Sequence, residues 1–241
     1  MPALLEVRSA SKNFGSLVVL DDLSFELEQG VAFGIVGPNG AGKTTLLNVV
    51  AGDVRPTSGS VVLGGRDVTR LASHTRCRLG IGRTSQVPRP FEGLTTFENV
   101  LVGANHGAAG RLATTPELAA MATLERVGML GKANTPAAQL TLLERKRLEL
   151  ARALATQPRL LLLDEIAGGL TEAEVHELVV TIKEIHADGV TIVWIEHIVH
   201  ALLSVVDRIM AIDYGRKLIE GEPNAVMSSA EVRQVYLGAE L

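Results

Sequence analysis

Cysteine, aromatic residues and long apolar runs are all scarce in this chain of 241 residues. The one cysteine, Cys77, excludes an internal disulfide and permits a reducing compartment. Aromatic residues make up 3% and the formal net charge is -4, which argues against nucleic acid as a partner. No run reaches the ~20 apolar residues that span a bilayer, and Met1–Ser11 lacks a secretory core. We therefore expect a cytoplasmic protein that reaches a membrane only through a protein partner.

Glycine, in contrast, is concentrated at Gly37–Thr45, which follows the phosphate-loop pattern of Gly, four free residues, Gly, Lys and Ser or Thr. A buried strand is expected before it at Val31–Val36, and a helix after it at Thr44–Ala51, with the helix N-terminus toward the phosphates. Lys43 would bind the β- and γ-phosphates, and the Thr44 hydroxyl would join the shell of a magnesium ion. The residues expected to contact the nucleotide are Gly37, Pro38, Asn39, Gly40, Ala41, Gly42, Lys43, Thr44 and Thr45. The loop predicts a nucleoside triphosphate without saying which one.

A second acidic motif follows the predicted buried strand Leu160–Leu163. Asp164 stands at the end of this strand, where a carboxylate can hold magnesium, often through water. Glu165 is then placed to polarise an attacking water. Two acidic residues at a strand end are common, but the phosphate loop in the same chain favours the catalytic interpretation.

Three isolated side chains are weaker candidates. Gln86 could bind magnesium through its amide and contact the γ-phosphate, or could be an ordinary surface glutamine. His197 follows a predicted strand and could contact the γ-phosphate, or could be structural. Phe14 lies at the turn between the predicted strands Leu4–Phe14 and Leu17–Leu27, where it could stack on a base or close the hairpin.

Helix starts are signalled by capping boxes, in which a Thr is followed three residues later by a Glu. The pattern occurs at Thr95, Thr141 and Thr171. In the predicted helical middle of the chain, Phe91 and Phe97 are most simply core residues.

Strands and helices alternate along the chain, which predicts an α/β fold with a mainly parallel sheet, a P-loop core and an N-terminal antiparallel β subdomain. The mostly helical residues 87–157 are interpreted as an inserted subdomain. Residues 1–86 and 158–241 then form the nucleotide-binding core of a single domain.

The order of these motifs resembles that of ATP-binding cassette (ABC) ATPases, from Leu4 to about Gly238. The order comprises the phosphate loop, the glutamine, the helical insert, LERKRLELARAL, LLLLDE and the histidine. The resemblance implies ATP and Mg²⁺, with Phe14 at the adenine-stacking position and Glu165 as catalytic base. It also implies a head-to-tail dimer, in which each ATP lies between one chain's phosphate loop and the other chain's signature motif. Thr141 belongs to that motif.

Two segments, Gly80–Phe91 and Leu94–Val100, look like the glutamine-loop region of branched-chain amino-acid importers, of the subunit type with the longer insert. The resemblance implies an ATP-hydrolysing subunit that drives uptake of branched-chain amino acids or related small polar solutes. It implies transmembrane permease subunits, a second ATPase subunit, identical or different, and indirectly a solute-binding protein. The chain would lie peripherally on the cytoplasmic face of the cell membrane, with Gln86–Asn99 docking a permease helix.

The signature motif departs from the family pattern Leu-Ser-Gly-Gly-Gln, because Leu140–Glu144 is Leu-Thr-Leu-Leu-Glu. Leu143 replaces the glycine that would approach the partner's γ-phosphate, and its side chain should hinder that approach. We therefore hypothesise one competent and one degenerate ATP site in a heterodimer. Alternatively, Leu140–Glu144 is simply the start of a well-capped helix.

Other functions remain open at this stage. An ABC exporter ATPase for lipid or polysaccharide is disfavoured by Arg83–Phe91. A soluble ABC ATPase without a permease would usually carry coiled-coil inserts or two cassettes, which are absent here. A GTPase would need an Asn-Lys-x-Asp motif, which the sequence lacks.

Overall fold

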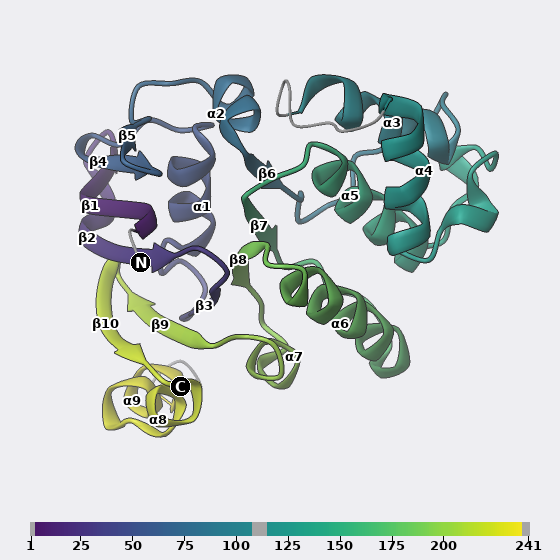
Figure 1. Ribbon diagram of the computed structural model, residues 1–241. Coiled ribbons are helices and arrows are strands. Elements are labelled where there is room, and N and C mark those ends of the chain that lie inside the picture. Colours follow the sequence, from purple (N-terminus) through teal and green to yellow (C-terminus); the bar gives the residue numbers. More distant parts are fainter. Residues whose placement is uncertain (1–2, 108–114, 238–241) are drawn as a thin grey trace.

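The computed structural model describes residues 3–107 and 115–237 of the chain (Figure 1). The strands are β1 (Ala3–Phe14), β2 (Leu17–Glu28), β3 (Ala32–Val36), β4 (Ser58–Leu63), β5 (Arg66–Asp67), β6 (Ile81–Arg83), β7 (Leu160–Asp164), β8 (Thr191–Ile195), β9 (Arg208–Asp213) and β10 (Arg216–Gly221). The helices are α1 (Lys43–Ala51), α2 (Ser73–Leu79), α3 (Thr96–His106), α4 (Pro116–Arg126), α5 (Leu142–Ala155), α6 (Glu172–Ala187), α7 (Val199–Leu203), α8 (Pro223–Ser228) and α9 (Ala230–Leu237), with 3-10 turns η1 (Leu130–Lys132) and η2 (Ala137–Gln139). None of the helices in these residues is both long and apolar enough to cross a bilayer.

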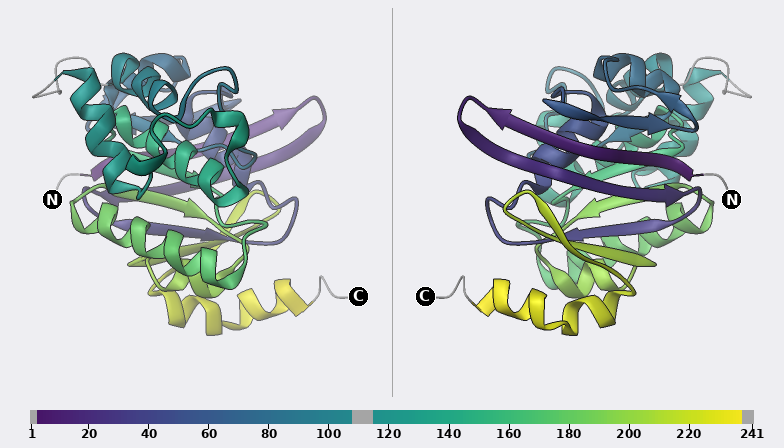
Figure 2. Two further views of the ribbon diagram at one scale, coloured as in Figure 1. Left: turned by 90° about the vertical axis from the view of Figure 1, so that its right-hand side faces the viewer. Right: turned by 90° about the vertical axis from the view of Figure 1, so that its left-hand side faces the viewer.

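The strands form two sheets, one antiparallel and one mainly parallel. The antiparallel sheet has the order β2-β1-β4-β5, and the tip of its β1–β2 hairpin projects beyond the rest of the molecule (Figure 2). The second sheet has the order β10-β9-β3-β8-β7-β6, parallel from β9 to β6, with β10 antiparallel to β9 at the edge. The predicted α/β fold with an N-terminal antiparallel subdomain and a helical part is confirmed.

Strand β8 shows how both faces of the parallel sheet are buried. Successive side chains of a strand point to opposite faces. Val193 and Ile195 pack with α1 and the antiparallel sheet, whereas Ile192 and Trp194 pack with α5 and α6. Each of these side chains stabilises the fold by about 1.5–3 kcal/mol through its burial. Helix α1 is therefore packed between the two sheets, and the loop before it is fixed at the carboxyl end of β3.

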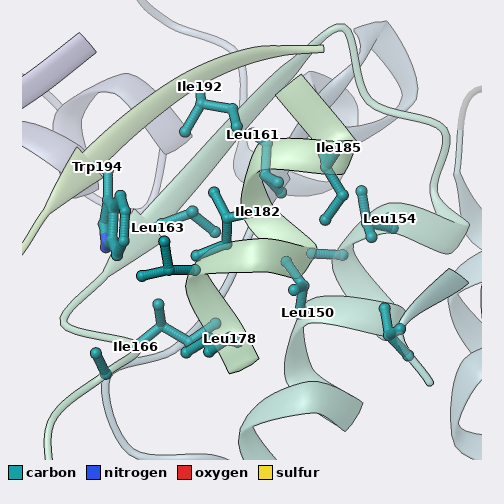
Figure 3. Close-up of a cluster of buried hydrophobic side chains, with 14 of the residues drawn as sticks. Leu150, Leu154, Leu161, Leu163, Ile166, Leu178, Ile182, Ile185, Ile192 and Trp194 are labelled. Atoms are coloured by element: carbon teal, nitrogen blue, oxygen red, sulfur yellow. The ribbon is translucent and has the colours of Figure 1, made fainter. Parts of the chain in front are cut away.

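The opposite face of the sheet holds the hydrophobic cluster of Figure 3. The labelled side chains are Leu150 and Leu154 of α5, Leu161 and Leu163 of β7, Ile166 after β7, Leu178, Ile182 and Ile185 of α6, and Ile192 and Trp194 of β8. Helix α5 thus packs on the strand that ends at Asp164, so the position of its N-terminus is linked to that strand.

Helices α3, α4 and α5 gather at one end of the molecule, away from the antiparallel sheet (Figures 1 and 2). The predicted capping boxes are confirmed: Thr95, Thr141 and Thr171 each accept a hydrogen bond from the N–H of the glutamate three residues later, whose carboxylate accepts the threonine's N–H. The division at residues 87–157 stays a prediction.

The expectation for Phe91 is wrong. Its side chain is 46% exposed, and the Arg152 guanidinium lies 4.8 Å from the ring centre. The loop before α3 runs along the outside, where the buried Asn99 binds both the N–H and the carbonyl of Phe91, at 2.8 and 3.1 Å. Phe97, by contrast, is partly buried against the core.

Helix α2 is a feature that the sequence did not predict, and its Arg76 is fully buried. The Arg76 guanidinium donates to the carbonyls of Val49 and Val50, both at 2.8 Å, and to those of Leu71 and Thr69 at 3.0 and 2.9 Å. Burial lowers the pKa of Arg76, and these carbonyls compensate for the lost water. Arg76 thus satisfies carbonyls at the C-terminal end of α1.

Candidate nucleotide site

The predicted phosphate loop joins β3, which is buried throughout, to α1. Gly42, the N-cap of α1, has a φ of 100°, and a Cβ atom there would lie 2.7 Å from the carbonyl oxygen of Val19 on β2. A Cβ atom on Gly37 would lie 2.2 Å from the carbonyl oxygen of Ile212 on β9. These glycines are therefore required by packing against β2 and β9, which the sequence alone did not reveal.

Lys43 begins α1 and is buried. Its ammonium group donates to the carbonyls of Gly37 and Pro38 at 2.7 and 2.9 Å. Burial lowers the pKa of Lys43, while the nearby carboxylates of Glu165 and Asp164 raise it. The cation is thus held within the loop, facing the two acidic residues that follow β7.

The rest of the loop offers an open surface. Its other residues are exposed at Asn39, Gly40 and Thr44, half-buried at Pro38 and Thr45, and buried at Ala41. The carbonyl of Ala41 accepts the N–H of Gly215 at 3.0 Å, which ties the loop to the β9–β10 hairpin. Since helix N-termini favour anions, phosphate oxygens can bind at this end of α1.

Asp164 is buried at the carboxyl end of β7, 3.5 Å from the Thr44 hydroxyl. Its other carboxylate oxygen accepts from Arg83, at 3.1 Å, and Arg83 also binds Asn48 at 2.5 Å and Asp53 at 2.7 Å. Burial raises the pKa of Asp164, and the Arg83 guanidinium lowers it. The structure therefore brings Thr44 and Asp164 together as the sequence predicted.

Glu165, the next residue, is contacted on both carboxylate oxygens. The Gln86 amide donates to Oε2, and His197 Nε2 lies 2.8 Å from Oε1. Gln86 follows β6, Glu165 follows β7, and His197 follows β8, so the three side chains meet because parallel strands end at the same edge of the sheet. A carboxylate held in this way can accept a proton from water.

Two predicted residues are not joined to this cluster. Thr141 caps α5 and bonds to Glu144. The Phe14 ring is half exposed and lies 4.7 Å from the Lys12 ammonium. Within residues 3–107 and 115–237, neither side chain is bonded to the phosphate loop. Both roles stay predictions.

Sequence reasoning missed Arg83, Lys146 and Glu196. Arg83 ends β6, and a charged residue at the carboxyl end of a strand is a signal that could have identified it. Lys146 lies within α5, and Glu196 directly precedes His197. Glu196 carries the same signal as Arg83, because it directly follows β8, whereas no sequence pattern distinguishes Lys146 from a surface residue; both are buried.

Comparison with known proteins identifies the family. The family model for ABC transporters matches residues 20–168, which include the phosphate loop, Gln86 and Glu165. The chain belongs to the ABC transporter family. As an ABC ATPase it binds nucleotide and hydrolyses ATP, which is the activity of the family.

This ABC ATPase is similar along its whole length to curated proteins. It is 35% identical to the high-affinity branched-chain amino acid transport ATP-binding protein LivG of Salmonella typhimurium, over 98% of each chain. It is 34% identical to BraF of Pseudomonas aeruginosa, a protein of the same description, again over 98% of each. It is also 35% identical to the lipopolysaccharide export system ATP-binding protein LptB of Acidithiobacillus ferridurans, over 99% of this chain and 98% of LptB.

Solved structures of ABC cassettes have the same fold. A nucleotide-free ATP-binding cassette from an ABC transporter is 27% identical, with a TM-score of 0.87 over 98% of this chain and 99% of that one. The ADP conformation of MJ1267, an ATP-binding cassette of an ABC transporter, is 28% identical, also with a TM-score of 0.87, over 99% and 100% of the two chains.

Proposed function

We propose that this ABC ATPase is the energy-coupling subunit of an importer for branched-chain amino acids or related small polar solutes. The observation that carries the energy-coupling part of the proposal, ATP hydrolysis, is the arrangement of Glu165. Its carboxylate is bound by Gln86 and His197, and it directly follows Asp164, which contacts Thr44 of the phosphate loop.

In the proposed reaction ATP lies along residues 37–45, with its β- and γ-phosphates at Lys43. Glu165 accepts a proton from water as the water oxygen forms a bond to the γ-phosphorus and the bond from that phosphorus to ADP breaks. His197 and Gln86 orient the carboxylate and contact the γ-phosphate. Correct positioning and charge neutralisation supply most of the catalysis in phosphoryl transfer.

The residues predicted to hold magnesium fit a hard cation. Thr44, Asp164 and Gln86 offer hydroxyl, carboxylate and amide oxygens, which are the donors that Mg²⁺ prefers. Magnesium bound there would neutralise charge on the β- and γ-phosphates. Arg83 compensates the buried Asp164 carboxylate from the side opposite Thr44, so the carboxylate stays available to a cation.

The proposed solute class rests on LivG and BraF together with the segment Gly80–Phe91. LptB is equally similar, so the percentage of identity does not separate import from export. The segment supports import, and it also has a clear structural role. It leads from β6 into the helical part and carries both Arg83 and Gln86 to the nucleotide site.

The proposed partners are transmembrane permease subunits, with a solute-binding protein reached through them, so the chain lies on the cytoplasmic face of the membrane. A cavity of about 520 Å³ opens between α2, β6, α3 and α5, beside the predicted docking segment Gln86–Asn99. Arg83, Arg89 and Glu149 are among the charged residues that line it. A permease helix seated there would lie close to Gln86.

The proposed ATPase partner is a different chain, because the signature motif is unsuited to phosphate. Leu142 and Leu143 occupy the first positions of α5, and the Glu144 carboxylate already accepts the N–H of Thr141. Lys132 pairs with Glu144 at 3.0 Å, and hydrogen bonds from Thr141 lower the pKa of Glu144, so the carboxylate stays charged. A phosphate at this helix end would meet the isobutyl group of Leu143 and a like charge.

The test uses Glu165→Gln, which removes the proposed base and should trap the ATP-bound dimer. The tagged full-length variant is solubilised from membranes of its own source with Mg-ATP, and the co-purifying proteins are identified. Permease chains together with a second, different ATPase support the proposal. Recovery only from the soluble fraction, or together with an export permease, contradicts the importer assignment. Wild-type hydrolysis by Glu165→Gln contradicts the role of the base.

A further inference from the structure

Glu196 is a buried carboxylate that the reaction above does not use. It follows β8, and only 2% of its surface is exposed. Its Oε1 accepts the N–H of Ala167 at 2.6 Å, and its Oε2 accepts the N–H of His197 at 3.0 Å. Burial raises the pKa of Glu196, and the backbone N–H groups around it lower it. A buried carboxylate with this many backbone donors fixes the backbone segments that supply them.

Glu196 joins the loop after β7 to the loop after β8, and these two loops carry the side chains of Glu165 and His197. Ala167 is two residues beyond Glu165 in the loop after β7, and His197 is in the loop after β8. The Glu165 carboxylate and the His197 imidazole lie 2.8 Å apart. Side chains on two separate loops keep such a distance only if the loops themselves are held together; the pairing of Asp164 with Ile195 does this at the strand ends, and Glu196 does it beyond them.

A buried cation lies on the other side of the same loop. Lys146 of α5 is 4% exposed, and its ammonium group donates to the carbonyl of Glu165 at 3.4 Å. Burial lowers the pKa of Lys146, and the negative charges of Glu196 and Glu165 raise it. Removing either Glu196 or Lys146 would leave a buried charge poorly compensated.

The backbone of Glu165 needs this support. Its φ of 46° lies in the left-handed region, which costs a residue with a side chain roughly 1–2 kcal/mol. The Glu165 N–H donates to the carbonyl of Ile195 at 2.9 Å, and its own carbonyl accepts from Lys146. Both peptide groups around this strained residue are therefore held, one by β8 and the other by α5.

We propose that Glu196 and Lys146 are positioning residues for ATP hydrolysis, which hold the loop of Glu165 against the loop of His197. This inference rests on the proposed role of Glu165 as the base. Neither residue touches the phosphate loop through any bond among residues 3–107 and 115–237. They set the rate of the chemical step while leaving ATP binding unchanged.

The informative variant is Glu196→Gln. The N–H groups of Ala167 and His197 bond to different oxygens of Glu196, and a glutamine side chain replaces one of these oxygens with an NH2 donor, so one N–H group would face a donor. Lys146→Met removes the cation and keeps much of the side-chain volume. Glu222→Gln is the matched control, because the Glu222 carboxylate also accepts two backbone N–H groups, at 2.9 and 3.1 Å, but at the start of α8.

Two measurements are made on the full-length chain. Phosphate release by the complex that co-purifies with it should fall by roughly 10²-fold in kcat for Glu196→Gln, the size of effect expected from a misplacement of about 1 Å, with KM for ATP within about twofold. Hydrogen exchange of the isolated chain should accelerate in residues 165–170 and 196–199 and stay unchanged in residues 37–45. In the double variant that combines Lys146→Met and Glu196→Gln, the loss in kcat should be smaller than the two single losses combined. Glu222→Gln should change none of these values.

An unchanged kcat, a parallel loss of ATP affinity, or faster exchange throughout the chain would overturn the inference. Failure of the proposed function is a different result: wild-type hydrolysis by Glu165→Gln, or a wild-type complex without hydrolysis. The exchange measurement needs no hydrolysis, so unchanged exchange in residues 165–170 and 196–199 of Glu196→Gln overturns the inference in that case also.

Discussion

Arg83 Nη2 lies 3.1 Å from Oδ2 of Asp164, and the same guanidinium reaches Asp53 at 2.7 Å and Asn48 at 2.5 Å. Arg83 thus joins the end of β6 to the end of β7 and to α1. Asp164 is 1% exposed, so its charge depends on this partner and on Thr44. The proposed magnesium site is consequently built on a carboxylate that one arginine both neutralises and orients.

Arg83→Met should therefore reduce hydrolysis. Loss of a charged partner to a buried carboxylate costs about 1–3 kcal/mol, and Asp164 would reorient. We expect a kcat at least about tenfold lower and a higher magnesium concentration for half-maximal rate, measured by phosphate release in a magnesium titration. Arg55→Met, at an exposed arginine, is the control. Equal magnesium dependence in the two variants would exclude this role for Arg83.

Leu143→Gly tests the degenerate-site hypothesis. Removal of the isobutyl group should open the N-terminus of α5 to a partner's γ-phosphate. In the assembled transporter, both the ATPase rate and the number of trapped nucleotides per ATPase pair should rise. Leu142→Gly is the control, because Leu142 Cδ2 packs 3.3 Å from the position that a Cβ atom on Gly169 would take. An unchanged rate and occupancy in Leu143→Gly would refute the hypothesis.

Arg76→Met should destabilise the fold without altering the site residues. Four carbonyls that now accept from the guanidinium would lose their donor, and each unsatisfied buried group costs about 1–3 kcal/mol. We expect the free energy of unfolding, measured in urea, to fall by about 3 kcal/mol or more. Arg78→Met, in the same helix but exposed, should change it little. Similar losses in both variants would show that the carbonyl contacts matter less than inferred.

The free energy of unfolding should also fall in acid, because the glutamates of the capping boxes become protonated. Hydrogen bonds from Thr171 lower the pKa of Glu174 below its ordinary value of 4.5. A lowered pKa in the folded state stabilises the protein above pH 4.5, and this contribution is lost as the pH falls through the folded-state pKa. Glu174→Gln keeps an acceptor for Thr171 but does not titrate, so its urea stability should depend less on pH between about 5 and 3. An unchanged pH dependence of the urea stability in Glu174→Gln, relative to the wild type, would contradict the assignment.

The sequence predicted those elements whose signals are local. Threonine and glutamate three residues apart specified the starts of α3, α5 and α6, and the apolar run before Asp164 specified β7. Helix α2 escaped because it is short and Ala72 caps it without a side-chain bond. Phe91 was misassigned since hydrophobicity does not reveal that an arginine covers a ring on the surface.

The residues of the candidate site likewise divide into those that the sequence predicts and those that it does not. Gln86, Glu165 and His197 could be predicted because each follows a strand, and parallel strands end together. Glu196 also follows a strand, but its role and that of Lys146 could not be predicted, because they depend on partners distant in sequence: the N–H of Ala167 and the carbonyl of Glu165. A charged residue can be recognised as buried and functional only once the fold has placed such backbone groups beside it.

The helical part is connected to the core through two neighbours in one sheet. The chain leaves at the end of β6 and returns at the start of β7, and Gly80 accepts the N–H groups of both Arg159 and Leu160, at 2.8 and 3.0 Å. Because β6 and β7 are parallel, these two connections lie at opposite edges of the sheet, and α5 also packs on β7 and bonds to the carbonyl of Glu165 through Lys146. A displacement of α3 to α5 by the proposed permease would therefore reach Gln86 through the segment after β6 and Glu165 through α5, so both partners of one hydrogen bond would respond.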